Sequence, residues 1–294
     1  MKTVPRNAPA IGPLTPQLYV PTPQRPLRAK QLRLLADTRV VPHAHPWGQV
    51  ALSATGVVRV TARNGSYIVP PSRAVWIPPG VEHAVTVIED ADLLTLYLHQ
   101  PRGRCGPARS AAESAGWRQC RVLEVSSLLL ALALQLDVAP DGSSEPLDRE
   151  RLARERRLAG LLLDELRRAA PVRLGIDLPH DKRLRRLCEA VIEDPSKHGT
   201  LAAWAEDTGA SARTITRLFR SELGTSFLQW RQQVLLARAV PLAARKLPMA
   251  SIAAELGYAS PSAFAAMVRR SVGTSPSRFL RANDRSSQPG RAPR

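Results

Sequence analysis

Two periods of hydrophobic residues divide the chain. Between residues 27 and 100, short runs of β-branched and aliphatic residues are separated by polar residues and turn formers. Between residues 182 and 280, apolar residues recur at spacings of three and four, which is typical of helices that bury one face. The pattern predicts a strand-rich amino-terminal part followed by a helical carboxy-terminal part.

A hairpin signal marks the strand-rich part. Asn64 and Gly65 separate two β-branched runs, and an Asn-Gly pair favours the tight turn that joins antiparallel strands. Further short runs lie at 74–77, 84–88 and 93–98. Many short strands at this spacing indicate a small sandwich or barrel, and we expect a small β-barrel.

Helical segments are predicted between the two parts. One spans residues 126–136, and a longer one spans 146–170 with a leucine stripe wider than a simple core contact needs. Residues 171–179 are predicted to be an interdomain linker.

The helical part contains one pattern twice, at 201–226 and 252–276. Each copy predicts a helix, a turn at a glycine (Gly209 or Gly257) and a second helix that begins after a capping serine (Ser211 or Ser260). Residues 227–244 predict a connecting helix that is weakened near its end by Pro241. Two helix-turn-helix motifs joined by a helix are expected.

Polar and basic side chains lie on the outer face of each predicted second helix. A helix-turn-helix whose second helix exposes arginines suits the DNA major groove. The candidate DNA-binding residues are Arg213, Thr216, Arg217 and Arg220 in the first copy and Ser262, Arg269 and Arg270 in the second.

Charge supports a nucleic-acid partner. The formal net charge is +17, and residues 181–294 hold 19 Lys and Arg against 9 Asp and Glu. A basic surface beside a helix-turn-helix favours phosphate contact, although a general arginine bias with solvated faces is the alternative. Three cysteines without paired spacing, no signal peptide and no apolar run of about 20 residues predict a cytoplasmic protein without a membrane partner.

The doubled motif resembles the DNA-binding domain of AraC/XylS-family transcriptional regulators. The resemblance covers residues 181–282 and rests on Gly257-Tyr258, Ser262-Ala263-Phe264 and the stretch 273–279, with Val268 where the family usually has Phe. It implies that Arg213, Thr216 and Arg217 contact bases. It also implies promoter DNA and RNA polymerase as partners, and a homodimer formed through the 146–170 helix. A brace against the strand domain is the other role open to that helix.

A histidine pattern lies within the strand-rich part. His43 and His45 are two residues apart, so on a strand both point to one face, and Gln49 and His83 can join them. Three imidazoles with an oxygen ligand suit a divalent transition metal ion. The pattern resembles the paired motifs of cupin domains, whose first motif usually has Glu where this chain has Gln49, and that exchange weakens the case for metal. A small-molecule pocket, a metal-sensing site and merely packed histidines remain as alternatives.

The expected fold is an α+β multidomain chain. It has a disordered proline-rich arm (1–26), a cupin-like effector-binding domain (27–100), a helical dimerisation region and linker (101–179), a double helix-turn-helix domain (180–282) and a disordered tail (283–294). The expected function is a DNA-binding transcriptional regulator that senses a small molecule or metal ion. A metal-dependent cupin enzyme fused to a DNA-binding module is the rival, disfavoured because Gln49 replaces Glu and no general base is evident. An architectural DNA-binding protein without an effector is a third hypothesis.

Overall fold

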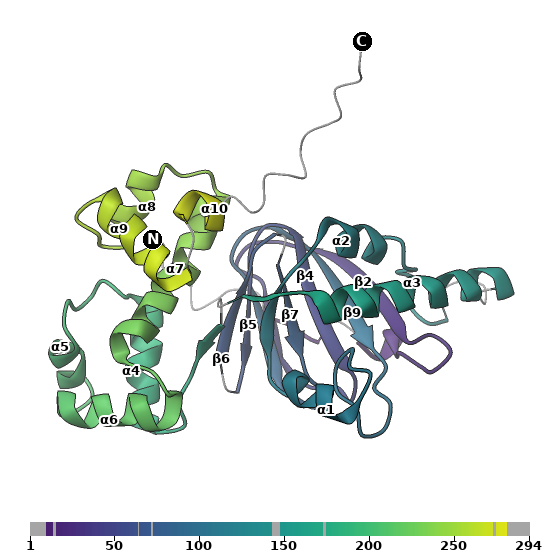
Figure 1. Ribbon diagram of the computed structural model, residues 1–294, viewed down its shortest axis with the longest axis horizontal. Helices are drawn as coiled ribbons and strands as arrows, with labels where there is room; N and C mark the ends of the chain where they lie inside the picture. The colour runs from purple at the N-terminus through teal and green to yellow at the C-terminus, as the bar shows by residue number, and fades with distance from the viewer. Residues whose placement is uncertain are drawn as a thin grey trace, which may run out of the picture. The chain divides into compact units, whose positions relative to one another are not determined.

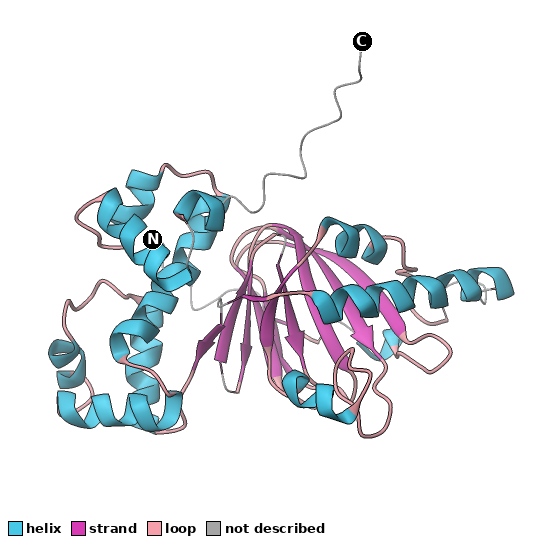
Figure 2. Ribbon diagram, viewed as in Figure 1, coloured by secondary structure: helices cyan, strands magenta, loops and turns pink. Residues whose placement is uncertain are grey.

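The computed structural model describes residues 10–13, 16–63, 65–71, 73–142, 148–172, 175–272 and 275–280. The chain divides into two compact units between Leu178 and Pro179, and each is described by itself. The first unit is rich in strands and the second is helical (Figures 1 and 2), as the hydrophobic periods predict.

Two six-stranded sheets form the framework of the first unit in the part of the chain that the structure describes. The first sheet has the order β1 (Ala10–Ile11), β3 (Arg39–His43), β8 (His83–Val87), β5 (Val58–Ala62), β6 (Gly65–Val69) and β12 (Gly175–Asp177). The second has the order β11 (Pro171–Val172), β10 (Arg121–Glu124), β7 (Arg73–Ile77), β4 (Gly48–Thr55), β9 (Ala91–Leu98) and β2 (Leu27–Leu34).

The expected barrel is not closed. The described strands form two separate sheets, whose edge strands are β1 and β12 in the first and β11 and β2 in the second. No ladder joins an edge strand of one sheet to an edge strand of the other within the described residues. The predicted hairpin is confirmed, because β5 and β6 are antiparallel with Ala62 opposite Gly65; Asn64 itself lies outside the described residues.

Two helices cover the second sheet. α2 (Ser127–Ala133) and α3 (Arg149–Arg168) share one apolar core with β2, β4, β7 and β9. Leu162 and Leu166 of α3 are fully buried in this core, beside residues such as Trp76 of β7. α3 therefore packs on the second sheet and stabilises its own unit as a brace. A second role for its exposed face is compatible with this packing. Shorter elements complete the unit: η1 (Pro16–Tyr19), α1 (Ala111–Ser114) and η2 (Ala115–Trp117).

Two segments differ from the expectations. The described residues of the expected disordered arm include β1, paired with β3, and η1, whose Tyr19 is buried; residues 1–9 and 14–15 lie outside the described residues. The expected linker 171–179 contains β11 and β12, which pair with β10 and β6. Region 101–179 thus contributes strands to both sheets, because very short strands can complete a sheet edge without a recognisable alternation. The expected tail 283–294 lies outside the described residues.

The helical unit contains both predicted helix-turn-helix motifs. Its helices are α4 (Lys182–Glu193), α5 (Leu201–Glu206), α6 (Ala212–Leu223), α7 (Phe227–Ala244), α8 (Met249–Glu255), α9 (Pro261–Val272) and α10 (Pro276–Leu280). α7 continues through Pro241 to Ala244. It contributes to both motif cores, since Trp230 contacts the Phe219 ring of α6, and Leu236 packs with Phe264 of α9.

The turns and caps follow the predicted chemistry. Gly209 and Gly257 have φ angles of 67° and 78°, in the left-handed region that glycine tolerates. Ser211 accepts a hydrogen bond from the Thr214 N–H at the start of α6, and Ser260 accepts one from Ala263 at the start of α9. Within the described residues, no helix is both long and apolar enough to span a bilayer.

Candidate functional site

The predicted histidine cluster forms between the two sheets. His43 ends β3 and lies opposite His83 at the start of β8, after an irregularity in the β3–β8 ladder. The centroids of these two rings are 4.3 Å apart, and the His45 ring is 5.3 Å from that of His83. Gln49 of β4 completes the group from the facing sheet. His45, Gln49 and His83 are buried and His43 is half-buried, so the structure brings all four predicted residues together.

Backbone carbonyls orient the three imidazoles. Nδ1 of His43, His45 and His83 lies 3.0, 2.8 and 2.9 Å from the carbonyl oxygens of residues 41, 47 and 81, respectively. A carbonyl only accepts, so each ring holds its proton on Nδ1 and leaves a lone pair on Nε2. Burial lowers the pKa of His45, and it lowers the pKa of His83 to about 4, which keeps both rings neutral at pH 7.

The donor set fits a divalent transition metal ion. One ligand nitrogen from each histidine lies within 4.8 Å of the others. In a tetrahedral site with Zn–N bonds of about 2.0–2.1 Å, two ligand nitrogens are ~3.4 Å apart, so the rings must move together by up to ~1.4 Å to bind one zinc ion. The buried Nε2 of His83 has no hydrogen-bond partner, as expected for a nitrogen that an ion or ligand would engage.

Gln49 changes this picture at one corner. Its side-chain Oε1 lies 2.7 Å from His45 Nε2. Since His45 already donates from Nδ1, a half-turn of the nearly isosteric amide presents its NH2 group to the Nε2 lone pair. The amide therefore competes with any metal ion for His45, whereas a carboxylate would act as a further ligand.

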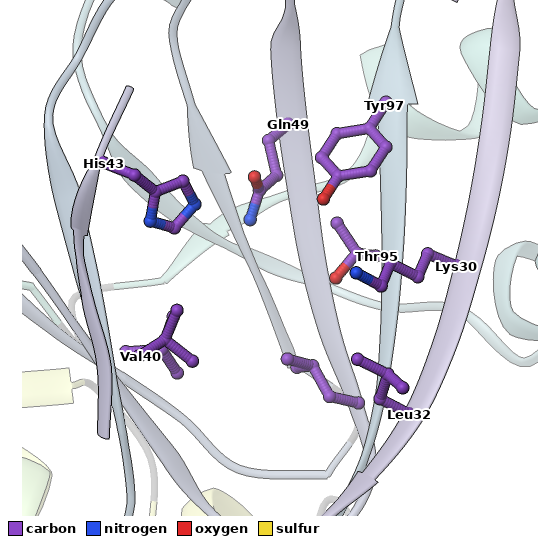
Figure 3. Close-up of a pocket in the computed structure, with 9 residues that line it drawn as sticks. Lys30, Leu32, Val40, His43, Gln49, Thr95 and Tyr97 are labelled. Atoms are coloured by element: carbon purple, nitrogen blue, oxygen red, sulfur yellow. The ribbon is translucent and has the colours of Figure 1, made fainter. Parts of the chain in front are cut away.

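Two residues of this group, His43 and Gln49, also line a cavity between the sheets (Figure 3). Its lining residues are Lys30, Leu32, Val40, His43, Gln49, Val85, Leu93, Thr95 and Tyr97. The volume open to the centre of a water-sized sphere is about 20 Å³, enough for a water molecule or an ion. A larger ligand must displace lining side chains.

Sequence reasoning missed the cavity residues from β2 and β9, notably Lys30, Thr95 and Tyr97. The Lys30 side chain is 5% exposed, and burial lowers its pKa to about 8. Trp47 stacks on His45 at a centroid distance of 5.1 Å, and its buried indole N–H has no hydrogen-bond partner. Trp76, by contrast, is a core residue that donates to the Trp117 carbonyl.

The first helix-turn-helix presents the predicted arginines on α6. Arg213, Arg217 and Arg220 are exposed, while Ile215 and Phe219 on the opposite face are buried. Thr216 is half-buried, and its hydroxyl donates to the Ala212 carbonyl at 2.8 Å. That hydroxyl can still accept a hydrogen bond.

The second helix-turn-helix is less polar. Ser262, Arg269 and Arg270 are exposed on α9, and the Ser262 hydroxyl lies 2.9 Å from that of the capping Ser260. Phe264 and Val268 are buried in the core of this motif. The outer face thus offers one small hydroxyl and two cations.

Hydrogen bonds separate these exposed arginines from structural ones. Arg231 of α7 donates to the Pro195 carbonyl, and Arg185 of α4 pairs with Glu189. In contrast, none of the predicted DNA-binding arginines on α6 and α9 forms an ion pair with a described residue. Their guanidinium groups are available to an external anion.

Comparison with known proteins agrees with this architecture. A family model described as an AraC-like ligand binding domain matches residues 34–156, and one described as a helix-turn-helix domain matches residues 204–282. The HTH-type transcriptional regulator NimR of Escherichia coli is 32% identical over 239 residues, covering 81% of each chain. The arabinose operon regulatory protein of Salmonella typhimurium is 29% identical over 126 residues, or 42% of this chain and 45% of that protein.

The solved structure of ToxT from Vibrio cholerae is a more distant match. It covers 88% of this chain and 99% of its own, with 11% identity and a TM-score of 0.35. The two family models match both parts of the chain, and the similarity to NimR extends over four-fifths of it. The chain belongs to the AraC family, as a DNA-binding transcriptional regulator with an amino-terminal ligand-binding domain.

Proposed function

We propose that the cavity between the two sheets binds an effector, a small molecule or a divalent metal ion, and that binding changes the affinity of the helical unit for promoter DNA. The observation that carries this proposal is the cluster of His43, His45 and His83, which borders the cavity through His43 and Gln49 and in which the buried Nε2 of His83 has no partner among the described residues. Three rings that backbone carbonyls hold in place form a preorganised donor set.

The two recognition helices are proposed to have different tasks. Arg213, Thr216 and Arg217 on α6 contact base edges, where an arginine can bind guanine O6 and N7 in a bidentate manner. On α9, Ser262 and its small neighbours respond to methyl groups and groove shape. Arg220, Arg269 and Arg270 bind the phosphate backbone, because they are exposed and free of acidic partners in the described chain.

The outer face of α2 and α3 is proposed as a homodimer contact. Leu161 of α3 is 55% exposed, Leu128 of α2 is 53% exposed, and Leu134, directly after α2, is 47% exposed. These leucines lie away from the core that Leu162 and Leu166 fill. Sedimentation of the full chain and of Leu161→Asp tests this, since the substitution should convert dimers to monomers.

Contact with RNA polymerase is part of the proposal for promoters that are activated.

The central experiment joins effector binding to DNA binding. Selection from random duplexes first yields a target for the full chain. Its affinity for that target is then measured with and without Ni²⁺, Zn²⁺ and a panel of small ligands, for the wild type and for His43→Ala and His83→Ala. His180→Ala, at an exposed position in the helical unit, is the control. Effector-dependent DNA affinity that both histidine-cluster variants lose supports the proposal; identical DNA affinity under every condition and for every variant refutes it.

A further inference from the structure

Lys30 is a buried cation without an acidic partner. It lies on β2, is 5% exposed and lines the cavity. Among the charged and aromatic groups of the described chain, it contacts only the Tyr19 ring, whose centroid lies 5.3 Å from Nζ. Burying an ammonium group is costly unless an anion or several acceptors compensate for the lost water. With its pKa lowered to about 8, Lys30 remains mostly protonated at pH 7, so the folded protein buries a charged group.

The neighbouring Arg28 shows how this fold treats a buried cation that has a structural role. Residues 28 and 30 share one face of β2, because side chains two apart point the same way. Arg28 is also almost fully buried, yet it pairs with Asp141 and donates to the Ala139 carbonyl at 2.9 Å. The chain therefore supplies a partner for one of the two cations and leaves the other facing the cavity.

The other residues that line the cavity indicate which kind of ligand would pair with Lys30. Lys30, Thr95, Tyr97 and Gln49 lie toward one end of the cavity and can all donate hydrogen bonds (Figure 3). The other lining residues include Leu32, Val40, Val85 and Leu93, and none of the described residues that line the cavity is acidic. The site thus combines a cation and several donors with an aliphatic wall.

We propose that the effector cavity takes a small carboxylate-bearing molecule, with its carboxylate against the ammonium group of Lys30 and a short hydrocarbon body against Leu32 and Val40. This inference rests on the proposed function and narrows the effector to one chemical class. A carboxylate is an acceptor-only anion, which matches the donors on this side of the cavity. The small free volume favours short chains over bulky ones.

The test uses matched acids and amides. Acetate, butyrate and benzoate, each beside its neutral amide, are titrated into the full chain in a buffer free of other carboxylates, and binding is followed calorimetrically. The wild type should bind at least one acid more than tenfold tighter than its amide. Lys30→Met should abolish this preference, and Lys30→Arg should retain part of it. Arg33→Met is the control, because Arg33 is an exposed cation on the same strand.

Three outcomes overturn the proposal: equal binding of acid and amide, an undiminished preference in Lys30→Met, or no binding of any acid. Inorganic phosphate is included as a competitor anion, and tighter binding of phosphate than of every carboxylate would also overturn it. The wider effector hypothesis is judged separately by titrating Zn²⁺ and Ni²⁺ into the same samples. Binding of those ions through His83 would sustain that hypothesis even where every carboxylate fails.

Discussion

The Gln49 side chain occupies the ring nitrogen of His45 that a metal ion would need: Oε1 of Gln49 lies 2.7 Å from His45 Nε2. Among the described residues, the other two histidines have no such competitor, and His83 Nε2 is unpartnered. The cluster therefore contains three histidines, and a metal ion could bind the third, His45, only after the Gln49 amide moves away from Nε2.

Replacing Gln49 with Glu should strengthen metal binding. The carboxylate adds a negatively charged oxygen ligand and no longer competes for the His45 lone pair, so affinity for Zn²⁺ or Co²⁺ should rise by at least about tenfold, or ~1.4 kcal/mol. Equilibrium dialysis measures the change. Gln31→Glu places the same charge at an exposed position of β2 and should have no effect. Equal affinity of Gln49→Glu and wild type would contradict the assigned ligand role.

Lys30→Met should stabilise the strand-rich first unit, here called the sandwich unit, at pH 7. Burial lowers the pKa of Lys30 from 10.5 to about 8. The unfolded chain therefore binds more protons than the folded chain between these values, so this group destabilises the fold fully below pH 8 and ceases to do so above pH 10.5. The gain at neutral pH is at most about 3 kcal/mol. Calorimetric unfolding of the full chain at pH 7 and pH 10 measures it.

The gain in unfolding free energy from Lys30→Met should be smaller at pH 10 than at pH 7. Arg33→Met should leave the stability nearly unchanged at both pH values. A destabilised Lys30→Met at pH 7 would mean that the ammonium group already has a favourable environment in the fold. A stabilised variant that fails to bind carboxylates would show that lost binding does not come from lost structure.

Arg217→Ala should relax sequence preference. Arg217 is exposed on α6 with no acidic partner in the described chain, and a bidentate contact to guanine discriminates by about 1–3 kcal/mol. Selection from random duplexes should then recover a degenerate base at one position. An unchanged consensus would remove Arg217 from the base-contacting set.

Arg269→Ala should weaken binding to all duplexes alike. A cation on the phosphate backbone contributes through counterion release, so its loss should reduce the slope of log affinity against log salt by about one. Affinity measured over a salt series, for a selected and a random duplex, gives both quantities. A loss confined to the selected duplex would instead place Arg269 on a base.

Leu166→Ala should destabilise the sandwich unit by about 2–5 kcal/mol, because Leu166 is fully buried where α3 packs on the second sheet. Leu161→Ala, on the exposed face of the same helix, should change the stability of the monomer little. Urea unfolding of the two variants compares them at low protein concentration. Equal losses would mean that α3 is not primarily a brace.

The helical unit was predictable because its signals are local. Gly209 and Gly257 mark positive φ, Ser211 and Ser260 mark the caps, and the periodicity of each helix identifies its buried face. Pro241 is the exception: the helix passes through it, because it lies in the last turn and a half of α7, whose side chains are held by the core of the second motif.

The sandwich was predictable only in part. The histidine cluster follows from short motifs, but Lys30 was missed because both faces of the first half of β2 are buried: Leu27 and Ala29 pack with α2 and α3, while Lys30 faces the cavity. A strand buried on both faces has no clear alternation. The pairing of β12 with β6 depends on contacts between residues far apart in the chain, and so does closure of the sheets into a barrel. Local sequence patterns do not reveal such contacts.

The continuous α7 has a consequence for the layout of a target promoter. A rod that is packed into the cores of both motifs leaves no hinge between α6 and α9, so the protein itself fixes the distance between the two DNA segments it contacts. Duplex DNA repeats about every 10.5 base pairs, and five inserted base pairs would turn one segment to the far side. Target promoters should therefore accept base changes between the segments far more readily than insertions or deletions.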